Sequence, residues 1–216
     1  MRAGRARLAM VTLGLLTVLA GCSRGEGPGP VANATIPGWR ASATQQDRVR
    51  LRGWRNAWMA ALPAARRADA SAVAAQGALF QPDRALPGAL PPPGSYRCRV
   101  FKLGQRVTAM AGYTEYPSFL CRIEGEGELL SLAKITGSQR PVGLLFPDSE
   151  LRAVFLGTLM LGDERRALSY GQDRERDLAG FMERIGESRW RLVLPYPHFE
   201  SLLDVIELVP ETPGAA

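Results

Sequence analysis

The chain has 216 residues, of which 46% are hydrophobic, and its net charge is +6. This length and apolar content are sufficient for one domain with a substantial core. The positive charge does not indicate a nucleic-acid partner, because the basic residues form no run interleaved with aromatic residues. All of the basic residues except Lys102 and Lys134 are arginines, a bias more typical of a GC-rich genome than of phosphate recognition.

The first residues have the pattern of a lipoprotein signal peptide. Three arginines precede a short uncharged run, and the small residues Ala20 and Gly21 then precede Cys22. The uncharged run is shorter than the about 20 apolar residues that a transmembrane helix needs. The sequence LAGC resembles a bacterial lipobox, so we predict a signal peptide over residues 1–21 and acylation of Cys22 with palmitate and related chains.

Acylation of Cys22 would anchor the protein in the bacterial envelope, because each buried methylene contributes about 0.8 kcal/mol. The next residue is Ser23, whereas an aspartate there usually retains a lipoprotein at the inner membrane. This favours the outer membrane, with the protein facing the periplasm. The alternative is an ordinary secreted protein with a chance cysteine at this position. Residues 22–40 are rich in glycine and proline without periodicity, which predicts a flexible tether.

A helical segment is expected over residues 41–80. The stretch TQQD, residues 44–47, resembles a capping box, and apolar residues at helical spacing predict a helix over about residues 45–62. Pro63 should end or kink this helix. An Ala-rich stretch over residues 64–79 predicts a second short helix.

Trp54 and Trp58 belong to the apolar stripe of the first helix. Such a stripe usually packs on the rest of its domain, and the alternative is a docking surface for a partner in an envelope assembly. Arg48, Arg52 and Arg55 form an adjoining stripe. A solvated helix face is the simplest interpretation, and contact with anionic lipid head groups is the alternative.

The chain changes character at residues 81–94, a connection with five prolines. Residues 95–210 alternate apolar and polar residues with a period of two, as strands with one buried face do. Eight short strands with short connections predict an α+β fold, in which the helices pack on an antiparallel meander curled into a barrel or sandwich. Residues 211–216 are expected to form a disordered tail. The expected strands cover about residues 96–100, 119–123, 128–135, 142–146, 151–161, 178–185, 188–194 and 203–209.

Cys98 and Cys121 remain as a pair once Cys22 is acylated. The alternation places both on the apolar faces of their strands, and the compartment beyond the inner membrane is oxidising. We therefore predict a disulfide that closes a loop of about 24 residues and stabilises the fold by about 3 kcal/mol. Two independent buried thiols are the alternative.

No motif in the sequence indicates a particular reaction. His198 is the only histidine, and neither a GxSxG turn nor another nucleophile signature accompanies it. With one histidine the chain lacks the ligands of a zinc site, and it contains no phosphate-binding or dinucleotide-binding loop, so no metal and no cofactor are expected. The long loop over residues 161–180 mixes acidic and basic residues. The turn that contains Arg140 offers a candidate ligand-facing arginine.

Several stretches carry a family resemblance, among them RLRGWRNAWMAAL, YPSFLCRI, KITGSQRPVGLLFPD and RWRLVLPYPHFESLLDVIELVP. Together they resemble a bacterial envelope family catalogued as a domain of unknown function, number 4893, over about residues 47–210. The resemblance implies one domain that includes both paired cysteines, and it supplies no activity, ligand or catalytic residue. A weaker similarity of shape, to lipocalin-like barrels such as periplasmic protease and lysozyme inhibitors, is an analogy of fold alone.

Three functions follow from these patterns. The first is a non-enzymatic lipoprotein of the outer membrane that uses one end of its barrel to bind a small apolar ligand, an envelope polymer or another protein. The second is an envelope hydrolase that uses carboxylates of the loop over residues 162–177. The third is a structural part of an envelope assembly that docks through Trp54 and Trp58.

The lipid anchor leads to the first prediction. Replacing Cys22→Ala should move the protein from the membrane fraction to the soluble fraction, because the acylated thiol is the only anchor that we expect. Fractionation of cells that produce either form measures the shift. Retention of the variant in the membrane fraction would contradict the lipobox.

Overall fold

The computed structural model describes residues 38–106 and 111–211. The predicted signal peptide, the predicted lipidation of Cys22 and most of the predicted tether lie outside the described residues, as does most of the predicted tail. These assignments remain predictions. None of the helices in the described part of the chain is long and apolar enough to cross a lipid bilayer.

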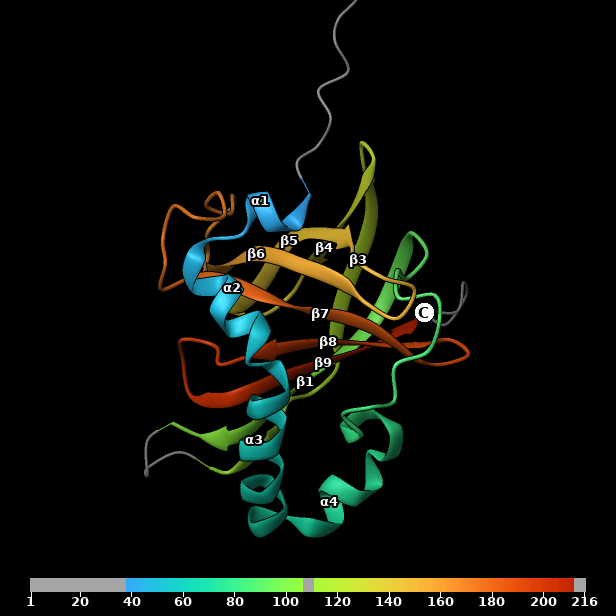
Figure 1. Ribbon diagram of the computed structural model, residues 1–216, viewed down its shortest axis with the longest axis vertical. Coiled ribbons are helices and arrows are strands. Elements are labelled where there is room, and N and C mark those ends of the chain that lie inside the picture. The colour runs from blue at the N-terminus through green and yellow to red at the C-terminus, as the bar shows by residue number, and fades with distance from the viewer. Residues whose placement is uncertain (1–37, 107–110, 212–216) are drawn as a thin grey trace, which may run out of the picture. The chain divides into compact units, whose positions relative to one another are not determined.

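Short helices precede the sheet (Figure 1). The helix α2 begins as the sequence predicts, because the hydroxyl of Thr44 accepts a hydrogen bond from the backbone N–H of Asp47 at 3.1 Å. Three other features differ from the prediction. The first α-helix starts within the predicted tether, the predicted single helix is divided at Gly53, and α3 continues through Pro63. The helical elements of the described chain are α1 (Trp39–Ser42), α2 (Gln45–Arg52), α3 (Trp54–Ala68), α4 (Ala70–Ala75) and the short 3-10 helix η1 (Gly77–Phe80).

Tertiary packing explains why Pro63 does not end α3. The proline removes one backbone donor and is itself exposed to solvent. Its neighbours on the inner face, Leu62 and Ala65, are buried against the sheet together with Trp58. Most of the stability of a helix in a protein comes from packing of this kind, so the lost hydrogen bond is tolerated.

The strands of the described residues form one antiparallel sheet, in which β1 lies between β2 and β3 and each strand from β3 to β9 pairs with the next one along the chain. Pairing of β1 with β9 closes eight of them into a barrel, and the short β2 adds to the free edge of β1. The predicted α+β fold is therefore confirmed, as a barrel and not a sandwich. The strand β2 was missed because it is only three residues long. The strands are β1 (Gly94–Gln105), β2 (Tyr113–Glu115), β3 (Phe119–Glu126), β4 (Leu129–Lys134), β5 (Gln139–Pro147), β6 (Ala153–Leu161), β7 (Asp177–Gly186), β8 (Arg189–Pro195) and β9 (Ser201–Pro210).

Apolar side chains from the inward faces of the strands fill one end of the barrel, here called the base. The Pro-rich connection covers this end, and its Ala89 belongs to the barrel core. Two aromatic side chains of the core donate hydrogen bonds to backbone carbonyls of this connection. The indole Nε1 of Trp190 donates to the carbonyl of Gly88 at 3.1 Å, and the hydroxyl of Tyr96 donates to that of Pro92 at 2.6 Å. The base is thus packed and closed.

The outer face of the barrel packs against α3. The indole of Trp58 is completely buried there, together with side chains of β1, β8 and β9 such as Phe101, Val193 and Val205. Figure 1 shows α3 lying across these strands, while α2 lies over β7. The apolar stripe of the predicted helix therefore packs on its own domain.

A buried ion pair fastens the 3-10 helix to the barrel. Arg191 of β8 and Glu183 of β7 are both fully buried, and the guanidinium Nη2 lies 2.7 Å from the carboxylate. The same guanidinium donates to the backbone carbonyls of Leu79 and Gln81 at 2.8 Å. Since these hydrogen bonds satisfy the buried charge, the pair holds the start of the Pro-rich connection in place.

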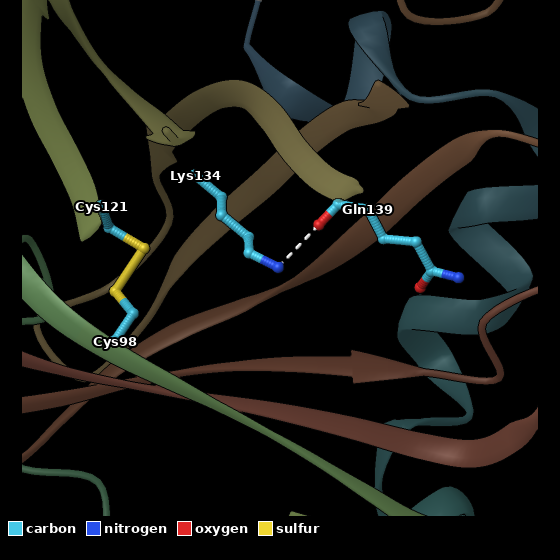
Figure 2. The surroundings of a disulfide bond; sticks show 4 residues. All are labelled: Cys98, Cys121, Lys134 and Gln139. Carbon is cyan, nitrogen blue, oxygen red and sulfur yellow. Dashed lines mark hydrogen bonds between the residues drawn. A yellow bond between two sulfur atoms is a disulfide. The ribbon is translucent and has the colours of Figure 1, made fainter. Parts of the chain in front are cut away.

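The predicted disulfide between Cys98 and Cys121 is confirmed, with the two Cα atoms 6.0 Å apart. Both cysteines face the barrel interior (Figure 2). The residue pairs that join β1 to β3 end at Cys98, which is opposite Phe119. The bond therefore holds the seam between these strands at the point where their pairing stops.

This position gives a stability prediction. The double variant Cys98→Ala, Cys121→Ala should lower the free energy of unfolding by about 3 kcal/mol, because the unfolded chain regains the freedom of the loop that the bond closes. Chemical denaturation of the oxidised protein and the variant measures the difference. Reduction of the wild type should give a similar loss, and equal stability in all three samples would contradict the proposed role of the bond.

Candidate functional site

A cavity of about 260 Å³ occupies the end of the barrel away from the base. We call it the mouth cavity. An engineered apolar cavity of about 150 Å³ is large enough to bind benzene, so this space can hold a larger apolar group. Polar and exposed side chains surround the entrance, among them Ser138 and Glu175. The deeper lining is apolar and consists of Val100, Pro141, Leu159, Leu178, Leu194 and Ile206.

The mouth cavity collects residues that are rare in this chain. Its lining includes Lys102 and Lys134, which are the only two lysines of the sequence, and His198, the only histidine. Lys102 follows Cys98 and Val100 on the inward face of β1, and Lys134 stands at the end of β4. Strand alternation therefore directs both ammonium groups inward.

Lys102 is neutralised by acidic residues. Its Nζ lies 3.2 Å from Asp204 and 3.0 Å from Glu200. Burial opposes the positive charge, but attraction to Asp204 and the hydrogen bond and charge of Glu200 outweigh it, so the pKa of Lys102 is raised. This ammonium is fully engaged by the protein.

The surroundings of Lys134 differ from those of Lys102. Its Nζ donates to the backbone carbonyl of Gln139 at 2.8 Å and lies 4.1 Å from the centroid of the Phe119 ring. Figure 2 shows the side chain extending toward that carbonyl. Among the described residues, no carboxylate lies within ion-pair distance of this ammonium. Burial lowers the pKa of Lys134, and the positive charges of Lys102 and Arg140 lower it further.

The loop between β8 and β9 forms part of the cavity wall. Tyr196 and Glu200 adopt left-handed backbone conformations with φ of 49° and 66°, which side chains other than glycine seldom adopt. The guanidinium of Arg106, the residue that follows β1, holds this loop, because its Nη1 donates to the carbonyls of Pro197 and His198 at 2.8 and 3.0 Å. The wall of the cavity is thereby fixed to the barrel.

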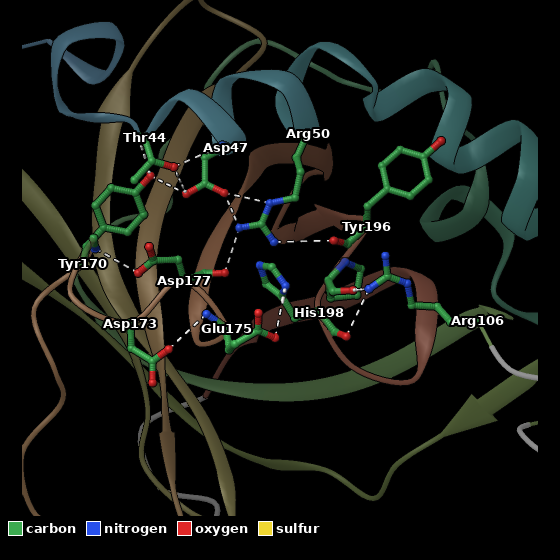
Figure 3. A network of polar contacts seen from close by, with 12 residues as sticks. Thr44, Asp47, Arg50, Arg106, Tyr170, Asp173, Glu175, Asp177, Tyr196 and His198 are labelled. Atoms are coloured by element: carbon green, nitrogen blue, oxygen red, sulfur yellow. Dashed lines mark hydrogen bonds and ion pairs between the residues drawn. The ribbon is translucent and has the colours of Figure 1, made fainter.

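His198 lies in this loop and faces the mouth cavity. Its Nδ1 lies 3.7 Å from the carboxylate of Glu175, and its Nε2 is buried without a hydrogen-bond partner among the described residues (Figure 3). Burial lowers the pKa of the imidazole, as does the charge of Arg50. The neutral ring is therefore favoured, and Nε2 is a polar atom available at the cavity.

A polar network behind His198 connects α2 to the loops of the mouth (Figure 3). Asp47 forms a buried ion pair with Arg50 and accepts a hydrogen bond from the hydroxyl of Tyr170. Arg50 Nη2 donates to the carbonyl of Asp177 at 2.8 Å, and its Nη1 donates to that of Tyr196 at 3.4 Å. Two loops and one helix are thus joined through a single arginine.

Two of the loop carboxylates proposed for a hydrolase, Glu164 and Asp177, accept hydrogen bonds that are structural. Glu164 accepts from the backbone N–H of Leu161 at 2.9 Å and pairs with Arg176 at 2.7 Å. The carboxylate of Asp177 accepts from the backbone N–H of Gly171 at 2.8 Å. Within the described ranges, no group of acidic, histidine or cysteine side chains has the arrangement of a metal site. These contacts fold the loop, and they do not place two free carboxylates in one cleft.

Three residues named from the sequence lie away from the mouth cavity. Arg140 points outward from β5, and its Nη2 donates to the carbonyl of Glu164 at 2.7 Å. Trp58 is inaccessible to a partner because it is fully buried, which removes it from the predicted docking surface. Trp54 is half-buried, with the guanidinium of Arg152 3.8 Å from its ring centroid.

The family model named Domain of unknown function (DUF4893) matches residues 39–208. The chain belongs to this family. No protein with a curated description and no solved structure is significantly similar to the chain. The match begins at the first residue of α1 and ends within β9, so the family comprises the helices and the whole barrel.

The two lysines give a pair of predictions with opposite signs. Lys134→Met should raise the free energy of unfolding by about 1 kcal/mol at neutral pH, because it removes a partly buried charge that has no counterion. Lys102→Met should lower it by about 3 kcal/mol, because Asp204 would remain buried without its cation. Chemical denaturation of both variants beside the wild type measures the two changes. A loss of stability in Lys134→Met would show that Lys134 is a structural residue.

The pH dependence of the Lys134→Met effect provides a further check. The folded protein binds the Lys134 proton less tightly than the unfolded chain does, because the pKa is lowered on folding. Between the lowered pKa and the ordinary value near 10.5, the unfolded state therefore binds more protons than the folded state. The free energy of unfolding of the wild type consequently rises with pH over this interval. The advantage of the methionine variant should accordingly shrink toward pH 10.5. An advantage that is constant up to that pH would contradict this origin.

Proposed function

We infer that this chain is a lipid-anchored protein of the bacterial envelope that binds a small apolar ligand in its mouth cavity. The observation that carries this proposal is the cavity itself, with its volume of about 260 Å³, apolar depth and polar rim. Ligand sites typically combine an apolar body with a few polar groups that orient the ligand. The packed base and the fastened loops support a site that exists before the ligand arrives.

The partners of the polar groups at the mouth favour a binding function over hydrolysis. Lys102 is held by two carboxylates, and the imidazole of His198 faces Glu175 and not a serine or cysteine. General-base catalysis needs a base within hydrogen-bond reach of its nucleophile. The described lining supplies orienting groups for a ligand and no such pair.

The proposed location rests on the sequence that precedes the barrel. The LAGC motif and Ser23 favour attachment of Cys22 to the outer membrane. A tether of the predicted length would let the domain meet small molecules of the periplasm while it stays on the membrane surface. The proposed role is therefore capture of an apolar molecule in an aqueous compartment of the envelope.

Filling the cavity should abolish ligand binding. Val100→Phe places a larger side chain on the inward face of β1, where the deep lining is apolar. We expect the affinity for octan-1-ol to fall at least tenfold, since the ring displaces two or more methylenes worth about 0.8 kcal/mol each. Titration calorimetry on the full chain carrying Cys22→Ala measures this without a detergent that would compete for the site.

The matched control is Val209→Phe, which makes the same exchange on β9 at a position that does not line the cavity. This variant should bind octan-1-ol as the parent chain does. Binding that is absent from the parent chain, or equally strong in both phenylalanine variants, would refute the mouth cavity as a ligand site.

A further inference from the structure

We propose that the ligand of the mouth cavity is a monocarboxylate with an apolar body, and that Lys134 is the residue that selects it. This inference rests on the proposed function and adds the chemical class of the ligand. Three properties of the cavity carry it, namely the uncompensated charge, the free donors of Lys134 and the size of the space.

The charge balance of the cavity comes first. Of its two lysines, Lys102 is paired with Asp204 and Glu200, whereas Lys134 has no carboxylate partner among the described residues. The acidic side chain at the rim, Glu175, lies beside His198. Lys134 is therefore the lysine of the cavity with no carboxylate beside it, and a ligand carboxylate at its Nζ would supply a local counterion.

The hydrogen bonds of Lys134 lead to the same ligand. An ammonium group has three N–H donors. One of them is directed at the carbonyl of Gln139, and the Phe119 ring lies against the group at 4.1 Å. The remaining donors can meet the oxygen atoms of a carboxylate, and such charge-assisted bonds are among the strongest in proteins.

Desolvation explains why an anion should be preferred over a neutral head. Lys134 loses part of its hydration in the folded protein without gaining a carboxylate, which is why its pKa is lowered. A bound carboxylate would remove this cost, whereas a hydroxyl would remove little of it. A cationic head placed beside Lys134 would add repulsion from its ammonium group.

The size of the cavity limits the rest of the ligand. Its volume of about 260 Å³ is close to the lower end of the range of about 300 to 1,000 Å³ that is typical of sites for drug-sized molecules. A single medium-length acyl chain or one substituted ring fits this space, and a lipid with two long chains does not. Leu178, Leu194 and Ile206 provide the apolar surface that such a chain would cover.

Three probes with the same chain and different heads test the inference. Octanoate, octan-1-ol and octylamine are titrated into the full chain carrying Cys22→Ala. We expect octanoate to bind at least tenfold more tightly than octan-1-ol, and octylamine to bind most weakly. In the added variant Lys134→Gln, octanoate should weaken to the affinity that octan-1-ol shows in the same variant, and a circular dichroism spectrum and melting transition like those of the parent chain show that the variant is folded.

The control variant is Arg122→Gln, which removes one positive charge from an exposed position outside the cavity. Its octanoate affinity should equal that of the parent chain, so that any loss in Lys134→Gln is not an effect of net charge. Lys134→Arg keeps a cation at the same position and should retain a preference for octanoate over octan-1-ol.

The outcomes separate the inference from the proposed function. If octan-1-ol binds as tightly as octanoate, and Val100→Phe abolishes both, the cavity binds ligands but the inferred class is wrong. If the octanoate preference survives in Lys134→Gln, Lys134 is not the selecting residue and the inference is also overturned. If none of the probes binds, the proposed function fails and the inference fails with it.

Discussion

The antiparallel pairing of β1 with β9 is the constraint on which the rest of the structure depends. It converts a meander into a closed barrel and gives each strand an inner and an outer face. In this register Lys102 stands directly opposite Asp204, so the closing pair of strands also forms an ion pair inside the barrel. A slip of one residue would turn Lys102 outward, and a slip of two would leave it buried without its partner. Closure and charge compensation therefore specify the same register.

The opposite edge of β1 has a different arrangement, and it explains the unequal roles of the two lysines. There β1 pairs with β3 only as far as Cys98, where the disulfide holds the seam, and the rest of the edge is taken by β2. Lys134 lies beyond this seam at the end of β4, next to a ring of β3 and a backbone carbonyl of β5. No strand pairing brings an acidic residue to it. We expect an ammonium in this position to lower the stability of the empty barrel, because burial lowers its pKa and no carboxylate of the described residues compensates it.

Period-two alternation was sufficient to predict an antiparallel meander of about eight strands, but it left the choice between a barrel and a sandwich open. The pairing of β1 with β9 decides that choice, and strands such as β6 and β8 are buried on both faces. The same rule could have located the site, since Lys102 and Lys134 occur in phase with buried residues, but lysine is usually read as an outward residue. The partners of the two lysines depend on strand register, which no local pattern contains. Local patterns also failed at Gly53 and Pro63, where packing of α2 and α3 on the barrel decides the course of the helix. The cysteine pair was predictable because strand alternation turns both thiols inward, and the predicted envelope location would favour their oxidation to a disulfide.

The helical segment determines the shape of the mouth as well as covering the barrel. Arg50 stands near the end of α2, and its guanidinium donates to the backbone carbonyls of Asp177 and Tyr196, which are adjacent to lining residues on two different segments of the mouth. Gly53 separates α2 from α3 shortly after Arg50. A Cβ atom at this position would lie 3.3 Å from the ring of Tyr196, so a glycine allows the helices to pass close to the loop. Asp47 compensates the charge of Arg50 within the same helix. These contacts fix the mouth loops to α2 and to the barrel in an arrangement that brings no carboxylate of the described residues to Lys134, which is the arrangement that the proposed recognition of an anionic ligand requires.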